Sequence, residues 1–484
     1  MYRHLTLLLL AAAFGCALLG GKTPSRQIQA DKNAGLQYLE DSFPQYDALQ
    51  KKIHSFAEPG YQETRSSAAL SGWLEDNGFS VQRGIAGIPT AFVARYGSGS
   101  PVIGLMAEFD ALPGMSQDTV TLRMPRVEGG YGHGCAHNLL GTAAVAGAVS
   151  ISRYLASGHQ GTVLLFGCPA EEGGSGKAYL VMDGFFDECD LVMDWHPHTA
   201  NTVRLSEGLA NVSAKFTFHG VSSHASDSPW NGRSALDAVE AMDHMMNLMR
   251  EHLPPQSRIH YVITDGGKAP NIVPERAQVY YYLRHPHGEF VQEMLQRTVA
   301  AAEGAAKGTG TTMTYELIHG NYETTINRHL AEMMLRNLVK VGGLDLDARE
   351  QEWLLDIMPE CGLERDSANL LAMTTVVPEI DAVTEDGAST DVGNVSRVVP
   401  VARLEMATSL KGIHTWQQAA TAGTTIGTKA LLGVAKVFFL TAVDLYNSPA
   451  DVSAIRSEFE ARFGKEPVFE PLQGHRTPPL DYRK

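Results

Sequence analysis

The stretch GTVLLFGCPAEEGGSG, residues 161–176, joins a continuous apolar run to a pair of acidic residues. Such a run is typical of a strand that is buried on both faces, as in a parallel sheet covered by helices. Residues 101–107 form a second run of this kind, and Glu108 and Asp110 follow it in the same way. In open α/β sheets, ligands bind where loops diverge from the carboxyl ends of the strands. The stretch therefore predicts an α/β sheet with polar side chains gathered along one edge.

Helical and strand patterns alternate on either side of this stretch. Residues 66–77 and 138–155 have helical patterns, and residues 191–195 form a third buried apolar run. Strands that alternate with helices are typical of a mostly parallel sheet covered by helices. We therefore expect a larger α/β domain built from residues 26–208 and 319–484.

The pattern changes between these two segments, where residues 209–318 predict a separate small domain. Apolar and polar residues alternate in its first strand, as expected for a strand with one wet face. The predicted order β-α-β-β-α-β is the ferredoxin-like arrangement. The strands are expected at residues 212–218, 258–264, 276–283 and 312–318, and the helices at residues 236–253 and 291–299. A helical pattern resumes at residues 327–342, so the small domain is inserted into the larger one.

The overall composition excludes some classes of partner. The chain has 484 residues, 44% of them hydrophobic and 19% charged, which is ordinary for a globular protein of two domains. Its formal net charge is −15. Nucleic acids and anionic lipid surfaces attract basic proteins, so this charge argues against both as partners.

The first residues have the pattern of an export signal. Arg3 and His4 precede an apolar run over residues 5–19, which is too short for a membrane span. We therefore expect residues 1–25 to be a signal peptide and the protein to be exported, either periplasmic or secreted. No transmembrane anchor is then expected in the mature protein. Lipid attachment at Cys16 stays open as an alternative.

The segment GHGCAHN, residues 132–138, offers donors for a metal ion. Cys135 lies two residues from His133 and two from His137. Thiolate and imidazole are good ligands for borderline-soft divalent metals. A nucleophilic Cys135 paired with a histidine is the alternative, but it would leave the nearby acidic residues without a purpose. This segment and the two acidic ones are each expected just past a buried strand.

Acidic residues and further histidines complete the predicted set of donors. Glu171 and Glu172 end the first stretch, where one can bind a metal while the other accepts a proton from water. Alone, such a pair is usually solvated surface, and a lone histidine is usually structural. The five candidate ligands supply enough N, O and S donors for two divalent ions. They are Cys135, His137, Glu172, His196 and His414.

The motifs of the chain resemble those of the M20 metallopeptidase and amidohydrolase family, and cover roughly residue 36 to the end. They are EFDALPG, GHGCAHN, PAEEGGSG, DWHPH, GVSSHAS, APNIVPE and GIHTW. The most similar branch holds the aminoacylases, the indoleacetyl-amino-acid hydrolases and the aminobenzoyl-glutamate hydrolases. The resemblance implies an α/β catalytic domain with two divalent ions (zinc, manganese or cobalt) and an inserted lid that dimerises. The implied reaction is hydrolysis of an amide bond in an N-acyl amino acid, an aminobenzoyl-glutamate-like compound or a dipeptide.

The resemblance also implies a role for each residue of the predicted metal site. Cys135 corresponds to a thiolate that bridges the two ions. Glu171 corresponds to the general base, and Asp110 to an acid that holds a metal ligand in place. Glu108 stands where other branches of the family have a histidine ligand. The remaining metal ligands correspond to His137, Glu172, His196 and His414.

Three residues of the lid have implied roles as well. His224 corresponds to a catalytic histidine that reaches the active site of the partner in a dimer. Asn271 and Arg284 correspond to residues that bind the carboxylate of the substrate, a task that suits a guanidinium. For Arg284, a surface charge on an edge strand is the alternative. The expected assembly is a homodimer, or a complex with a related sister subunit. A noncatalytic partner subunit of a heteromeric amidohydrolase is the alternative function, although the filled metal and base positions count against it.

Overall fold

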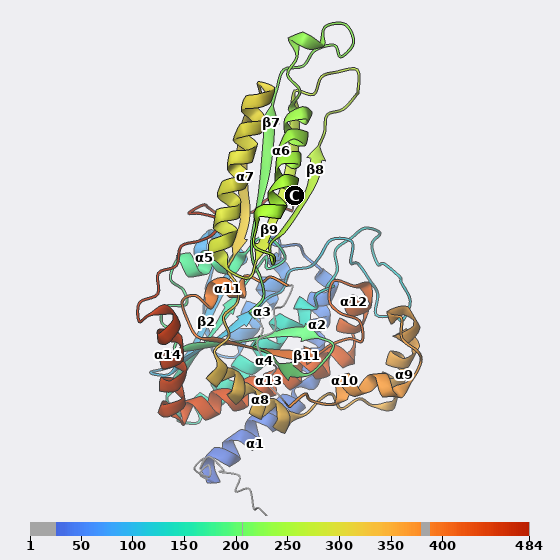
Figure 1. The fold of residues 1–484 in the computed structure, drawn as a ribbon. Coiled ribbons are helices and arrows are strands. Elements are labelled where there is room, and N and C mark those ends of the chain that lie inside the picture. The colour runs from blue at the N-terminus through green and yellow to red at the C-terminus, as the bar shows by residue number, and fades with distance from the viewer. Residues whose placement is uncertain (1–25, 206, 379–387, 484) are drawn as a thin grey trace, which may run out of the picture.

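The computed structural model describes residues 26–205, 207–378 and 388–483. The predicted signal peptide, residues 1–25, and Cys16 lie outside the described residues. In the rest of the chain, a compact body carries a long projection formed by one continuous insertion (Figure 1).

The body is built around a seven-stranded sheet in the order β1-β2-β4-β3-β5-β11-β6. The inner strands β4, β3, β5 and β11 are parallel to one another, whereas β1, β2 and β6 pair antiparallel at the edges. The strands are β1 (Ser80–Arg83), β2 (Phe92–Ser98), β3 (Val102–Ala107), β4 (Gly161–Gly167), β5 (Leu191–His198), β6 (Thr202–Val203) and β11 (Val401–Ala407). Every residue of β3 and β4 is buried, as their continuous apolar runs predict.

Helices cover both faces of this sheet. One face packs against α4 (His137–Ala156), α8 (Arg328–Val341) and α13 (Thr425–Tyr446), which share one apolar core with it. A second core on the other face includes α5 (Gly176–Met182) and α11 (Val392–Val395). This layered arrangement confirms the predicted α/β class.

The other helices lie around the body. They are α1 (Arg26–Asp41), α2 (Phe43–Phe56), α3 (Thr64–Asp76), α9 (Ala348–Ile357), α10 (Leu371–Thr374), α12 (Trp416–Ala422) and α14 (Pro449–Phe463). Short 3₁₀ turns occur at Ile85–Gly87, Pro229–Asn231, Arg250–His252, Met358–Cys361 and Ser367–Leu370.

Two of the described helices, α4 and α13, are long and apolar enough to cross a membrane by length and composition. In each, 89% of the apolar window is buried inside the protein. The two helices pack against each other, and Gly147 of α4 faces Phe438 of α13. Their apolar character is therefore explained by their place in the core of the body.

The projection contains the inserted domain that the sequence predicts. Its sheet has the order β10-β7-β9-β8, with every pair antiparallel, and α6 and α7 pack against one face around a separate core. The elements are β7 (Ala210–His219), α6 (Ala235–Met249), β8 (Arg258–Asp265), β9 (Arg276–His285), α7 (Gly288–Thr309) and β10 (Thr312–Asn321). The chain order β7-α6-β8-β9-α7-β10 is ferredoxin-like. The domain boundaries at residues 209 and 318 stay a prediction.

Candidate metal centre

The carboxyl ends of the inner strands deliver the acidic residues to one edge of the sheet. Asp110 follows β3, and Glu171 and Glu172 follow β4. Two local expectations were wrong. Residues 132–138 come after a long loop and lead into α4 rather than following a strand. His196 lies within β5, because β5 pairs with β11 as far as His198.

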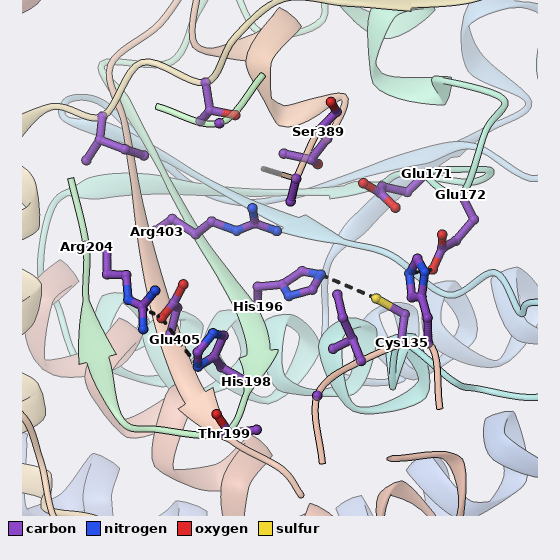
Figure 2. A pocket seen from close by; sticks show the side chains of 18 of the residues that line it. Cys135, Glu171, Glu172, His196, His198, Thr199, Arg204, Ser389, Arg403 and Glu405 are labelled. Atoms are coloured by element: carbon purple, nitrogen blue, oxygen red, sulfur yellow. Dashed lines mark hydrogen bonds and ion pairs between the residues drawn. The ribbon is translucent and has the colours of Figure 1, made fainter. Parts of the chain in front are cut away.

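The five predicted metal ligands lie in two groups that share Cys135. Donor atoms of Cys135, His137 and His196 all lie within 4.8 Å of one another. Donor atoms of Cys135, Glu172 and His414 meet the same limit. The Sγ atom of Cys135 is 3.4 Å from Nε2 of His196, as Figure 2 shows. The chain therefore brings together donors from four separate segments, and a thiolate at Cys135 could contact two ions.

Asp110 holds two of these groups in position. Its Oδ1 lies 2.9 Å from Nδ1 of His137, and its Oδ2 accepts a hydrogen bond of 3.0 Å from the backbone N–H of Glu172. Burial opposes ionisation of Asp110, but the hydrogen bond and charge of His137 outweigh it and lower the pKa of this carboxyl. A carboxylate in this place fixes the ring of His137 so that Nε2 faces the site.

Glu171 lies at the same site with only 9% of its side chain exposed. Its Oε2 is 4.0 Å from Nε2 of His137. Burial raises the pKa of Glu171 well above its usual value, and the charges of Glu108 and Glu172 raise it further. Cations bound nearby would lower that pKa, because they stabilise the carboxylate form.

The site fits metal ions in both its unpaired atoms and its donor types. Among the described residues, Nε2 of His137, Oε1 of Glu172 and Oε2 of Glu108 are buried without a hydrogen-bond partner. Each such atom costs roughly 1–3 kcal/mol if nothing binds it. Sulfur, imidazole and carboxylate donors together suit zinc, manganese or cobalt. Hydrogen bonds to Cys135 and Glu172 raise the pKa of His414 to about 11, so a proton takes the place of positive charge there.

Strained backbone concentrates around the same donors. Ala136, Ala170 and His414 have φ values of 58°, 58° and 60°, in the left-handed region that side chains with a Cβ disfavour. The N–H of His414 donates a 2.7 Å hydrogen bond to the carbonyl of Gly134, which ties the two ligand loops together. The N–H of Ala170 donates to a carboxylate oxygen of buried Glu63 at 2.9 Å. These contacts maintain a conformation that places the donors.

A buried group of charges beside the donors was not predicted from the sequence. The Nζ atom of Lys177 lies 2.5 Å from Oε1 of Glu108 and 2.6 Å from Oδ1 of Asp391, and all three side chains are fully buried. Lys177 therefore neutralises the acid that stands where other branches of the family have a histidine ligand. No local pattern marks a lysine as buried, so only the acidic member, Glu108, could be singled out.

His133 does not take part in the site. Its Nε2 lies 3.2 Å from the backbone carbonyl of Ile53, and its ring lies 6.0 Å from that of His54. Burial lowers the pKa of His133 to about 3, so the ring is neutral. Of the two histidines that flank Cys135 in the sequence, only His137 lies among the donors.

The lid residues divide between two places. Arg284, near the base of β9, lines a cavity of about 570 Å³ together with Cys135 and Glu171. His224 and Asn271 lie in the loops at the other end of the projection, where His224 bridges to Ile272. The structure thus brings Arg284 to the site of its own chain but not His224 or Asn271. A part for those two in catalysis requires a second chain.

Comparisons with known proteins give consistent relatives. Residues 210–310 match the family model of the M20 peptidase dimerisation domain. The chain is 35% identical over 466 residues to one of the subunits of p-aminobenzoyl-glutamate hydrolase from Escherichia coli, covering 91% of this chain and 97% of that protein. It is 27% identical to the Xaa-Arg dipeptidase of Mus musculus, covering 92% and 96%. A solved dinuclear metal-binding peptidase of the M20 family from Bacillus subtilis has the same fold, with a TM-score of 0.55, 16% identity, and coverage of 86% and 99%.

Proposed function

This chain belongs to the M20 peptidase family, whose members hydrolyse amide or peptide bonds, and on that premise we propose that it releases an amino acid from an acylated donor. The donor is an N-acyl amino acid, an aminobenzoyl-glutamate-like compound or a dipeptide. One observation carries the proposal: Cys135 is shared by two groups of metal donors that lie beside the buried carboxyl of Glu171.

Two divalent ions, of zinc, manganese or cobalt, complete the proposed site. Cys135 would lie between them, with His137 and His196 on one side and Glu172 and His414 on the other. When bound, such ions polarise a substrate carbonyl and make a neighbouring water more acidic.

The side chains around the ions then have distinct tasks. Glu171 accepts a proton from water on its carboxylate and later passes that proton to the nitrogen of the leaving amine. Asp110 keeps His137 and the backbone of Glu172 in place through the two hydrogen bonds described above. Arg284 binds the carboxylate that every free amino-acid end carries.

Removal of Cys135 is expected to empty both ion positions. In a Cys135→Ala variant, each donor group loses the ligand that it shares with the other, so metal content should fall from two ions per chain toward none. Atomic absorption of the purified protein measures this, together with hydrolysis of an N-benzoyl amino acid. Cys361→Ala is the matched control, because Cys361 is buried in a separate apolar cluster. Two ions retained in Cys135→Ala, or activity that survives exhaustive chelation, would refute the proposal.

We propose that the active form is a homodimer joined through the projection. Strand β8 is an edge of the described sheet, and its Val262 and Ile263 are 59% and 45% exposed. Leu248 on the adjacent helix α6 is 60% exposed. An exposed apolar edge strand favours pairing with a second copy. Such a dimer would allow His224 of one chain to approach the cavity of the other.

Mixed dimers test the proposed part of His224. His224→Ala and Glu171→Gln homodimers should each be nearly inactive, because every site then lacks one group. Coexpression of the two variants should restore about a quarter of the wild-type activity, since about half of randomly paired dimers are mixed and each contains one complete site. Kinetic assay of the coexpressed sample, with its mass checked by light scattering, gives the result. Failure to recover activity in confirmed mixed dimers would exclude an exchange of His224 between chains.

We also propose that the protein is exported and needs no sister subunit. The basic residues Arg3 and His4 before the apolar run at residues 5–19 support export. The complete donor set within one chain supports independence from a sister subunit. Recovery of a shortened, active protein from the periplasm or medium is expected. A full-length cytoplasmic product, or activity only after addition of a related chain, would contradict these two proposals respectively.

A further inference from the structure

Two neighbouring strands form the floor of the cavity. In the parallel pairing of β5 with β11, Arg403 lies opposite Asp194, and Glu405 lies opposite His196. Because side chains alternate along a strand, these residues share one face, while their neighbours Trp195 and Leu404 are buried in the core. Arg403 therefore lies on the same surface as His196, one of the proposed metal ligands.

The guanidinium of Arg403 has little to bind within the protein. Its Nε lies 3.2 Å from Oδ2 of Asp194 without forming a hydrogen bond. No carbonyl or carboxylate in the described part of the chain accepts a hydrogen bond from it. Figure 2 shows the group extended into the cavity between His196 and Ser389. A guanidinium has five N–H donors, and donors that stay unmade in a secluded site are costly.

The part of the cavity away from the metal donors is rich in arginine. Arg204, Arg284 and Arg403 all line it. The Nε of Arg204 is 3.0 Å from Oε2 of Glu405, so that pair is balanced. Arg284 donates a 2.8 Å hydrogen bond to the hydroxyl of Ser389 and is not paired with a carboxylate among the described residues. This distribution of charge favours an anionic group of a substrate and opposes a cationic one.

We propose that Arg403 binds a second carboxylate of the leaving amino acid, so that N-acylated acidic amino acids are the preferred substrates. The inference rests on the proposed function, in which Arg284 takes the α-carboxylate. Because Ser389 contacts Arg284 and also borders the guanidinium of Arg403, a side-chain carboxylate of the same amino acid lies within the reach of Arg403. The planar guanidinium matches a carboxylate with two parallel hydrogen bonds. A cationic side chain in this place would meet Arg403 directly.

A matched series of substrates tests this selectivity. N-benzoyl-glutamate, N-benzoyl-glutamine and N-benzoyl-arginine share one acyl group and differ only in the leaving amino acid. Wild-type kcat/KM should favour the glutamate compound over the glutamine compound by roughly 10–100-fold, the range expected for a charge-assisted hydrogen bond. The arginine compound should be the poorest of the three. In Arg403→Met, the advantage of glutamate should disappear, with glutamine hydrolysed about as before.

Three further variants separate recognition from folding and from general charge. Arg403→Met leaves Asp194 buried and unpaired, so the double variant Asp194→Asn with Arg403→Met removes both charges and should show the same loss of selectivity. Arg403→Lys keeps the charge without the planar fork and should retain part of the preference. Arg95→Met, at an exposed ion pair with Glu188, should keep the wild-type ratio.

Binding measurements distinguish failure of this inference from failure of the proposed function. If Arg403→Met and the double variant lower kcat/KM equally for the glutamate and glutamine compounds, or leave their ratio unchanged, Arg403 does not read a second carboxylate. If the wild-type enzyme hydrolyses none of the three, the proposed function fails. Calorimetry with Glu171→Gln protein then decides the role of Arg403 alone. Tighter binding of benzoyl-glutamate that depends on Arg403 supports it, and equal binding of benzoyl-glutamine overturns it.

Discussion

A Glu171→Gln variant is expected to lose activity by a factor on the order of 10²–10⁴ or more in kcat while its fold and metal content stay unchanged. The amide has nearly the shape of the carboxylate but cannot accept a proton from water. Glu171 has no place in either donor group that contains Cys135, so the loss of its charge should leave those ligands intact. Steady-state kinetics on an N-benzoyl amino acid, together with metal analysis of the same preparation, measures both quantities.

The neighbouring acid supplies the control for this prediction. Glu172 lies in the donor group with Cys135 and His414. A Glu172→Gln variant should therefore lose activity together with bound metal, whereas Glu171→Gln should lose activity alone. Wild-type turnover in Glu171→Gln, or loss of metal equal to that of Glu172→Gln, would remove Glu171 from the role of general base.

A Lys177→Met variant is expected to lower the free energy of unfolding by about 3–5 kcal/mol. The substitution keeps most of the volume of the side chain but removes the cation between Glu108 and Asp391. Both carboxylates are fully buried and each lies within hydrogen-bond distance of the lysine ammonium. Left without it, each must stay ionised in an apolar place or take up a proton, and both outcomes destabilise the fold. Urea unfolding followed by circular dichroism measures the change.

An exposed ion pair provides the comparison for Lys177. Lys51 and Asp47 lie 2.8 Å apart on the surface of α2, and 44% of the lysine side chain is exposed. Lys51→Met should change the stability by no more than about 1 kcal/mol, because solvent screens such pairs. If Lys177→Met were as stable as Lys51→Met, the buried group of charges would have no structural importance.

Local patterns in the sequence were enough to predict the strands that position the site. The run at residues 161–168 lacks any period because β4 is covered by helices on both faces, and that absence of a period is itself visible. The strand β11 was not predicted. Its segment VARLEMA alternates apolar residues with Arg403 and Glu405, and its pairing with β5 joins segments about two hundred residues apart. Local sequence contains no record of such a pairing.

The same difference separates the site residues that could be predicted from those that could not. Cysteine, histidine and paired glutamates have few other uses at the end of a buried strand, so residue type alone indicated metal chemistry. Lys177 and Arg403 are common residue types whose importance comes from burial and register. Neither property can be seen before the chain is folded. For this reason the donors were predicted, while the charges that surround them were found only in the structure.

Anomalous diffraction from crystals loaded with zinc or manganese would locate the proposed ions. Two peaks per chain are expected, one among Cys135, His137 and His196 and the other among Cys135, Glu172 and His414. Each should lie within about 2.0–2.3 Å of its donors, with the Cys135 sulfur bound to both. A fully loaded crystal with no peak at these residues, or with ions that do not share Cys135, would contradict a two-metal hydrolase built on this thiolate.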